Sequence, residues 1–84
     1  MSEGWQYVAS ASGIEFLYRC KAGERRRLIA ALRSLADNPS IKPDASSTDL
    51  TGRPISLVRF HGFEIAYWVD HFAKEVRVIE VSFT

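Results

Sequence analysis

Arg59, His61 and Glu64 are the side chains of this sequence whose types and spacing are suited to chemistry. A guanidinium group binds phosphate, an imidazole accepts a proton near neutral pH, and a carboxylate acts as an acid or a base. All three fall within the segment 59–64, which brackets a short turn. We therefore treat them as the candidate catalytic residues, with His61 as a general base or a phosphate contact at the tip of the turn.

Each of these residues also has a purely structural interpretation. His61 precedes Gly62, and His is one of the few non-glycine residues that tolerate the left-handed conformation of a tight turn. Arg59 has the spacing to pair across a sheet with Glu64 or Glu80, and such neighbours commonly form an ion pair with no catalytic role. The sequence leaves both interpretations open.

A second set of residues is suited to binding a nucleic acid or a protein partner: Arg26, Arg33, Arg53, Trp68 and His71. Trp68 falls on the outer face of its strand, where an aromatic ring favours stacking or a partner surface, unless the segment 40–53 covers it. Arg26 and Arg33 lie opposite the apolar stripe of a helix, where they suit RNA or an acidic partner segment, or simply face water. His71 reaches the face of His61 only if its loop folds back, and is otherwise a solvated loop residue.

Three predicted antiparallel strands position the candidate catalytic residues: Ile55–Phe60, Phe63–Val69 and Glu75–Phe83. Only His61-Gly62 separates the first two strands, which is the length of a type I′ hairpin turn. Alternation in the second strand puts four apolar side chains on one face, namely Phe63, Ile65, Tyr67 and Val69. In the third strand we expect Val76 and Val78 on one face, and Arg77, Ile79 and Val81 on the other.

The apolar face of this meander needs a cover, and the sequence before it supplies two amphipathic helices. One helix is expected from about Gly13 to Cys20, with an apolar stripe made of Ile14, Leu17 and Tyr18. The other is expected over Glu24–Asp37, where Leu28, Leu32 and Leu35 recur at helical spacing and Asn38-Pro39 ends the helix.

Two further segments complete the chain. Trp5–Ala9 is short, aromatic and β-branched, and is predicted to be an edge strand of the same sheet. Ser40–Arg53 has no periodicity and is predicted to be a long loop that Leu50 anchors. The predicted fold is therefore α+β in a single domain, residues 1–84. One antiparallel sheet, made of the N-terminal edge strand plus the C-terminal three-strand meander, packs against a two-helix hairpin.

The formal net charge is only +1, which excludes a protein that binds polyanions with its whole surface. The charge is segregated, however. Six Lys and Arg residues and only one acidic residue, Glu24, lie between Arg19 and Arg33, so that this segment has a net charge of +5, whereas residues 41–84 sum to −1. Such a local basic patch matters more to a nucleic-acid partner than the total charge does.

The cysteine and histidine content and the lengths of the apolar runs exclude several classes of protein. One cysteine, Cys20, and two histidines make neither a disulfide framework nor a metal-ligand set, so that we expect no metal and no cofactor. No apolar run approaches the ~18 residues of a membrane span, and the first residues do not resemble a signal peptide. These features predict a cytoplasmic protein without a membrane partner.

Four local patterns, in this order along the chain, resemble the RelE/ParE superfamily of toxins from bacterial type II toxin–antitoxin systems. They are the helical run Arg26–Pro39, the Leu50-x-Gly52 step, Arg59 on the following strand, and Phe63-x-Ile65-x-Tyr67 on the next. The resemblance covers nearly the whole chain. It implies a toxin that inhibits translation at the mRNA or the ribosome, that is neutralised by a cognate antitoxin, and that forms a homodimer or a hetero-oligomer with that antitoxin.

The sequence departs from the RNA-cleaving members of the superfamily at the positions of their active site. Those members place basic residues on the second strand, an Arg after the aromatic residue of the third, and Arg, Tyr or His at or beyond the end of the fourth. The corresponding residues here are Ile55 and Leu57, then Glu64, then Thr84, so that only Arg59 matches a basic position of the family.

This departure leaves two functions open. Cleavage of RNA requires a base for the 2′-hydroxyl, cations for the phosphate charge and an acid for the leaving group. One function is therefore a ribosome-dependent mRNA endonuclease with non-standard residues. The other is a protein that acts only by binding, such as a DNA gyrase poison of the ParE type or an inactivated toxin that acts through its antitoxin.

Overall fold

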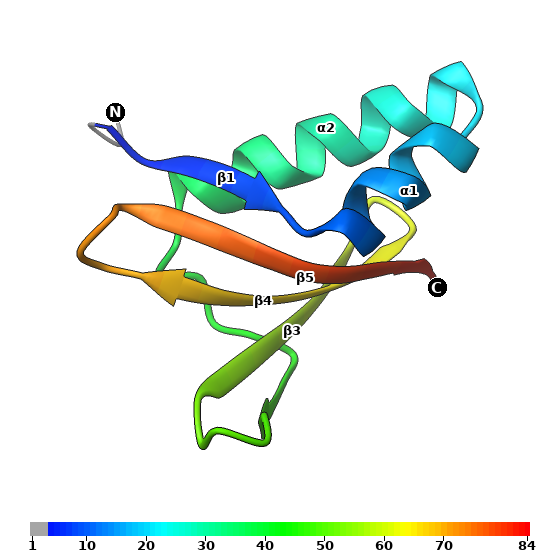
Figure 1. Cartoon of the computed structure of the whole chain (residues 1–84). Coiled ribbons are helices and arrows are strands. Elements are labelled where there is room, and N and C mark those ends of the chain that lie inside the picture. Colours follow the sequence, from blue (N-terminus) through cyan, green and yellow to red (C-terminus); the bar gives the residue numbers. More distant parts are fainter. Residues whose placement is uncertain (1–3) are drawn as a thin grey trace.

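A computed structural model of the chain describes residues 4–84. Two helices cover one face of a five-stranded sheet, and the opposite face of the sheet is open (Figure 1). The elements, in chain order, are β1 (Gln6–Ala9), α1 (Ala11–Arg19), α2 (Ala22–Asp37), β2 (Ala45–Thr48), β3 (Pro54–Phe60), β4 (Phe63–Asp70) and β5 (Glu75–Phe83). The predicted α+β class, with a helical hairpin on a sheet, is confirmed.

The meander β3–β4–β5 is antiparallel, as predicted. Its first turn consists of His61 and Gly62, which have φ angles of 58° and 85°. Positive φ at both central residues is what a type I′ turn requires, and it matches the right-handed twist of the flanking strands. The turn therefore fixes the register that pairs Arg59 with Glu64 and Phe60 with Phe63.

The prediction that Val81 shares a face with Arg77 and Ile79 is wrong, because β5 contains a bulge. Ala66 pairs with Glu80 and Tyr67 pairs with Val78, so that Ile79 has no partner of its own. One extra residue reverses the alternation beyond it. Val81 is consequently buried together with Val78, while Ile79 is exposed.

The predicted edge strand β1 exists, but the sheet is mixed rather than purely antiparallel. β1 runs parallel to β5, with Gln6 opposite Glu75 and Ala9 opposite Val78, and the strand order is β1-β5-β4-β3-β2. No tight turn links β1 to its neighbour, because the whole helical hairpin and three strands intervene. The turn chemistry that enforces antiparallel pairing within the meander therefore does not act on β1.

The apolar stripe predicted for α1 is confirmed at Leu17, which packs against the core, and is wrong at Ile14 and Tyr18. Ser10 caps the helix by accepting a hydrogen bond from the Gly13 N–H (3.2 Å). Gly13 and Cys20 are buried, whereas Ile14 and Tyr18 are 45% and 80% exposed. A Cβ atom on Gly13 would lie 3.4 Å from the Cβ of Ala9, so that the helix packs its residue without a side chain against the end of β1. This close approach sets the rotation of α1, and it moves Ile14 and Tyr18 into water.

The segment 40–53 is not an unstructured loop anchored by Leu50. It contains the short strand β2, and Leu50 is fully exposed. Polar contacts hold the β2–β3 turn instead: the Asp49 carboxylate accepts hydrogen bonds from the N–H (2.9 Å) and hydroxyl (2.7 Å) of Thr51 and from the N–H of Arg53 (2.9 Å). These bonds, with the Thr51 hydroxyl foremost, lower the pKa of Asp49. The turn is thus an Asx-type structure that needs no apolar anchor.

The core lies between α2 and β4, as the helical periodicity predicts. The leucines Leu28, Leu32 and Leu35 are buried in one cluster with Phe63, Ile65 and Tyr67, and Val69 packs at its margin. None of the helices within residues 4–84 is long and apolar enough to cross a membrane.

Leu32→Ala tests the placement of this core. We expect it to lower the free energy of unfolding by roughly 2–5 kcal/mol, because it removes buried methyl groups and leaves a cavity. Urea denaturation followed by circular dichroism measures the change. Leu50→Ala is the matched control, since Leu50 is fully exposed and its truncation is expected to leave stability within about 0.5 kcal/mol. Equal unfolding midpoints for Leu32→Ala and the parent would contradict the packing of α2.

Candidate functional site

The open face of the sheet, opposite the two helices, displays the outward residues of β3, β4 and β5. Alternation along β4 buries Phe63, Ile65 and Tyr67 under the helices, so that Glu64 and Trp68 point to the open face. Two groups of side chains gather there. One lies beside the β3–β4 turn, and the other lies beside the β4–β5 turn, at the far end of β4.

Beside the β3–β4 turn, Arg59 and Glu64 form the cross-strand ion pair that was one of the sequence interpretations. The Arg59 Nε lies 2.8 Å from the Glu64 Oε2. The backbone N–H of Arg59 donates a hydrogen bond to the Asp44 Oδ2 at 2.7 Å. The hydrogen bond to Glu64 raises the pKa of Arg59 further above its ordinary value. Arg59 is therefore a permanent cation that cannot take up a proton, and the carboxylate beside it matches its charge.

His61 lies against the other face of the sheet. Its ring packs edge-on against Phe60 at 5.4 Å between centroids, and Phe60 packs onto the core under the helices. The same ring lines a shallow cavity of about 410 Å³ that includes Asn38, next to the end of α2. The His61 carbonyl accepts a hydrogen bond from the Arg27 Nη1 at 3.0 Å. The three candidate catalytic residues are thus divided between two faces, and their catalytic role stays a prediction.

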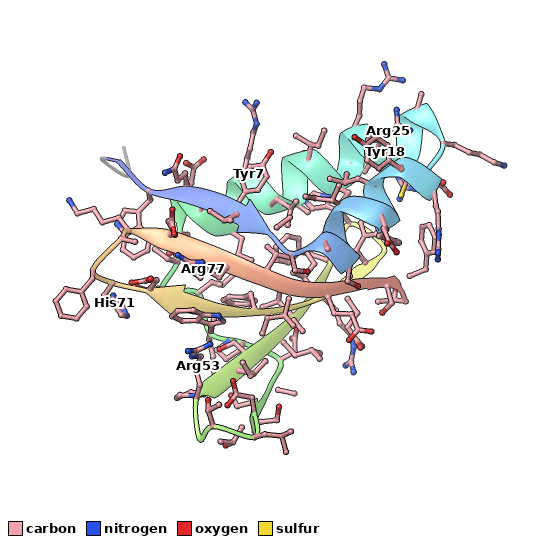
Figure 2. All side chains as sticks on the ribbon, viewed as in Figure 1. Tyr7, Tyr18, Arg25, Arg53, His71 and Arg77 are labelled. Carbon is pink, nitrogen blue, oxygen red and sulfur yellow. The ribbon has the colours of Figure 1, made fainter. Side chains whose placement is uncertain are left out.

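Beside the β4–β5 turn, Trp68 is surrounded by cations. The guanidinium carbon of Arg53 lies 4.1 Å from the centroid of the indole, and that of Arg77 lies 5.5 Å away. In Figure 2, Arg53 lies just before β3 and Arg77 lies on β5, on the two sides of β4. Both distances are within the range of cation–π attraction. The end of the segment 40–53 therefore covers Trp68 in part, through Arg53, and the indole is half-buried.

Arg77 is a member of this group that sequence reasoning did not select. Its Nη2 lies 2.8 Å from the Glu75 Oε1, and its Nε lies 3.5 Å from the Asp70 Oδ2. Arg77 pairs directly with Trp68 in the β4–β5 register. The signal was available in the sequence, because Arg77 alternates with the buried Val76 and Val78 and so has to face outward beside β4.

His71 lies in the β4–β5 turn, at the opposite end of β4 from His61, so that the two histidines do not form one site (Figure 2). Its ring packs edge-on against Trp5 at 5.9 Å. The turn is held by the Asp70 Oδ1, which accepts the N–H groups of Ala73 and Phe72, each at 3.1 Å. These bonds, that from Ala73 foremost, lower the pKa of Asp70.

Arg26 and Arg33 lie on the solvent side of α2, away from the open face. Arg33 borders a shallow cavity of about 380 Å³ with Trp5 and Tyr7. Within residues 4–84, no group of His, Cys, Asp and Glu side chains is arranged to hold a metal ion. The geometry of the open face is suited to contacts made by paired charges and an aromatic ring, and it does not assemble a proton-transfer pair.

The element order and the strand order together define a RelE-type α+β fold. The chain superposes on a chain of the intact E. coli RelBE toxin–antitoxin complex with a TM-score of 0.71 and 16% sequence identity, covering 95% of this chain and 96% of that one. It superposes on the RelBE2 toxin–antitoxin complex of Mycobacterium tuberculosis with a TM-score of 0.74 and 10% identity, covering 96% and 99%. The archaeal RelE–RelB complex of Pyrococcus horikoshii OT3 gives 0.68 and 15%, covering 95% and 94%.

The fold that the sequence resemblance implied is thus confirmed. The sequence itself matches no family model and no curated protein. At these identities the likeness to solved structures establishes the fold, and the roles of individual residues have to be argued from this chain's own contacts.

Arg53→Ala tests the cover over Trp68. In a Trp5→Phe background, where Trp68 is the remaining tryptophan, we expect acrylamide to quench its fluorescence more strongly after Arg53 is truncated. The loss of the cation–π contact is expected to cost about 0.5–1 kcal/mol of stability. Arg59→Ala is the matched control, because it removes an arginine from the same face that is paired with Glu64 instead. Equal quenching in both variants would show that Arg53 does not shield the indole.

Proposed function

We propose that this chain is the toxin of a toxin–antitoxin pair, that it acts in the cytoplasm on the translation machinery, and that a cognate antitoxin neutralises it. The observation that carries the proposal is the match of fold over almost the full length of chains from three toxin–antitoxin complexes. Because 94–99% of each of those chains is covered, the likeness supports a shared type of partner.

We further propose that the toxin acts by binding and not by cutting RNA. Glu64 occupies the position where the family resemblance expects an arginine, and its carboxylate would repel a scissile phosphate. The one matching cation, Arg59, is already paired with that carboxylate at 2.8 Å. Losing one preorganised group that stabilises developing charge typically costs about 10²–10³ in rate. Several such groups are replaced here, so that catalysis at the rate of an RNA-cleaving toxin is not expected.

The antitoxin is proposed to bind along the sheet or the helices. Peptide segments commonly bind a domain of this kind by adding a strand at an edge or by laying an amphipathic helix in a groove. The edges of the sheet are β1 and β2, and all four side chains of β2 are exposed. A strand with a neighbour on one side only has backbone groups free for such an addition.

A ribosome-programmed mRNA cleavage assay tests the catalytic part of this proposal. We expect the parent protein to produce no cleavage at rates comparable with an RNA-cleaving toxin assayed beside it. Arg59→Ala, His61→Ala and Glu64→Ala are expected to behave like the parent. Efficient cleavage by the parent that collapses in Arg59→Ala or His61→Ala would overturn the binding-only proposal and would assign a non-standard active site to the β3–β4 turn.

Expression of the chain in a bacterium tests the biological part. We expect growth to arrest with a loss of protein synthesis, and we expect co-expression of the small open reading frame adjacent to this gene to restore growth and to yield a stable complex. Arrest with DNA damage and continuing protein synthesis would favour a gyrase-directed poison instead. A soluble, inert monomer that ignores the adjacent gene product would contradict the toxin proposal.

A further inference from the structure

Most of the positive charge of this protein lies on the helical hairpin and not on the open face of the sheet. Residues 11–37 contain six cations, namely Arg19, Lys21, Arg25, Arg26, Arg27 and Arg33, and three carboxylates, Glu15, Glu24 and Asp37. Five of the six cations lie between Arg19 and Arg27, together with the single carboxylate of Glu24. The α1–α2 end of the hairpin is therefore a strongly basic surface.

Two of these cations are held in fixed positions by carbonyl groups. The Arg25 side chain donates from Nε to the Leu17 carbonyl (3.1 Å) and from Nη2 to the Cys20 carbonyl (3.0 Å), at the end of α1. Arg27 donates to the His61 carbonyl and lies 5.5 Å from the centroid of Phe63. A carbonyl orients a guanidinium group without cancelling its formal charge. These contacts therefore create cations that lose little further side-chain freedom when an anion binds.

Three of the four remaining cations lie at the α1–α2 turn, and the fourth, Arg33, lies farther along α2. Arg19 is the last residue of α1, Lys21 is the residue before α2, and Arg26 lies one turn into α2. All three are exposed. Placing basic residues in the first turns of α2 opposes the helix dipole, which favours anions at a helix N-terminus. The cations at this end therefore lower the stability of the helix, which favours a role for them in binding a partner outside the protein.

An exposed aromatic ring lies within the same surface. Tyr18 is 80% exposed, and it follows Leu17, whose carbonyl binds Arg25. Figure 2 places both Tyr18 and Arg25 at the α1–α2 end of the molecule. A ring that is left in water next to cations is the combination with which proteins bind single-stranded nucleic acid, because bases stack on the ring while the cations hold the phosphates.

We infer that the end of the helical hairpin, formed by Tyr18, Arg19, Lys21, Arg25 and Arg26, is a nucleic-acid binding surface that contacts the phosphodiester backbone and stacks a base on Tyr18. It lies on the opposite side of the sheet from the open face and does not use Arg59 or Glu64. This surface rests on the proposed function, because it would be the part of the toxin that contacts RNA of the translation machinery. An acidic protein segment would use the cations but would have no need of the ring.

Salt-dependent binding of a fluorescent single-stranded RNA to the purified chain tests this surface. Each phosphate contact contributes about 0.7 to the slope of log K against log salt, or roughly 5-fold in affinity at 0.1 M salt. The variant R19Q/K21Q/R26Q is therefore expected to bind roughly 100-fold more weakly at 0.1 M salt, with a slope shallower by about 2. Duplex RNA and duplex DNA of the same length, measured beside it, identify the form of nucleic acid that binds best.

Matched variants separate this surface from general charge and from stability. K42Q/K74Q removes two exposed cations from loops outside this surface and is expected to leave affinity and slope within about 3-fold of the parent. Tyr18→Ala is expected to weaken single-stranded RNA binding about 5- to 100-fold, and Tyr18→Phe is expected to retain it, because the stacking face is kept. Thermal unfolding of every variant shows whether a loss of binding comes from loss of the fold.

Three results would overturn the inference. The first is that the parent binds no nucleic acid at 0.05 M salt. The second is that K42Q/K74Q loses as much binding as R19Q/K21Q/R26Q. The third is full competition by poly-glutamate at the charge concentration of the RNA. The last result would assign the surface to an acidic protein partner. The assay does not depend on growth arrest, so that a chain without toxicity can still bind RNA here, and a toxic chain can fail to bind.

Discussion

The contact between the leucines of α2 and the apolar side of β4 is the interaction on which the rest of the molecule depends. Leu28, Leu32 and Leu35 are buried against Phe63, Ile65 and Tyr67. A chain of 84 residues supplies a single helical hairpin, which covers a single face of the sheet. The other face has to remain compatible with water, and it does so with ion pairs and with arginines laid over an indole. The packing of the core and the polar character of the open face therefore have the same cause, namely that one helical hairpin can cover only one face of the sheet.

Features that depend on neighbouring residues could be predicted from the sequence. The leucine periodicity of α2, the alternation along β4 and the two-residue turn at His61-Gly62 are local, and each is found in the structure. The ion pair of Arg59 with Glu64 was one of the sequence interpretations for the same reason, because a two-residue turn fixes which residues face each other. The bulge at Ile79 has no comparable sequence signal, and it was enough to place Val81 on the wrong face.

Features set by distant contacts could not be predicted. The rotation of α1 depends on how closely Gly13 approaches Ala9, and the direction of β1 depends on β5. The contact of Arg53 with Trp68 depends on the path of the β2–β3 turn, which places Arg53 beside β4. The exposure of Leu50 is possible because hydrogen bonds to Asp49 hold that turn. For the candidate site, the sequence correctly predicted which candidate residues lie on strands and which lie in turns. The division of His61 and Glu64 between two faces became evident only in three dimensions.

The parallel pairing of β1 with β5 also determines at what stage of folding the sheet is completed. The Ser10 hydroxyl donates to the Ile79 carbonyl across 69 residues, so that the first strand finds its partner only in the last. Closing so long a loop costs entropy that no local contact repays, which makes this pairing a late event in folding. During synthesis, a nascent chain lacks both the edge pairing and the core residues Val76 and Val78 until β5 has left the ribosome. A cell therefore meets the finished sheet only after β5 has been translated, and nascent chains that stop before β5 lack its central pairing with β1 and β4.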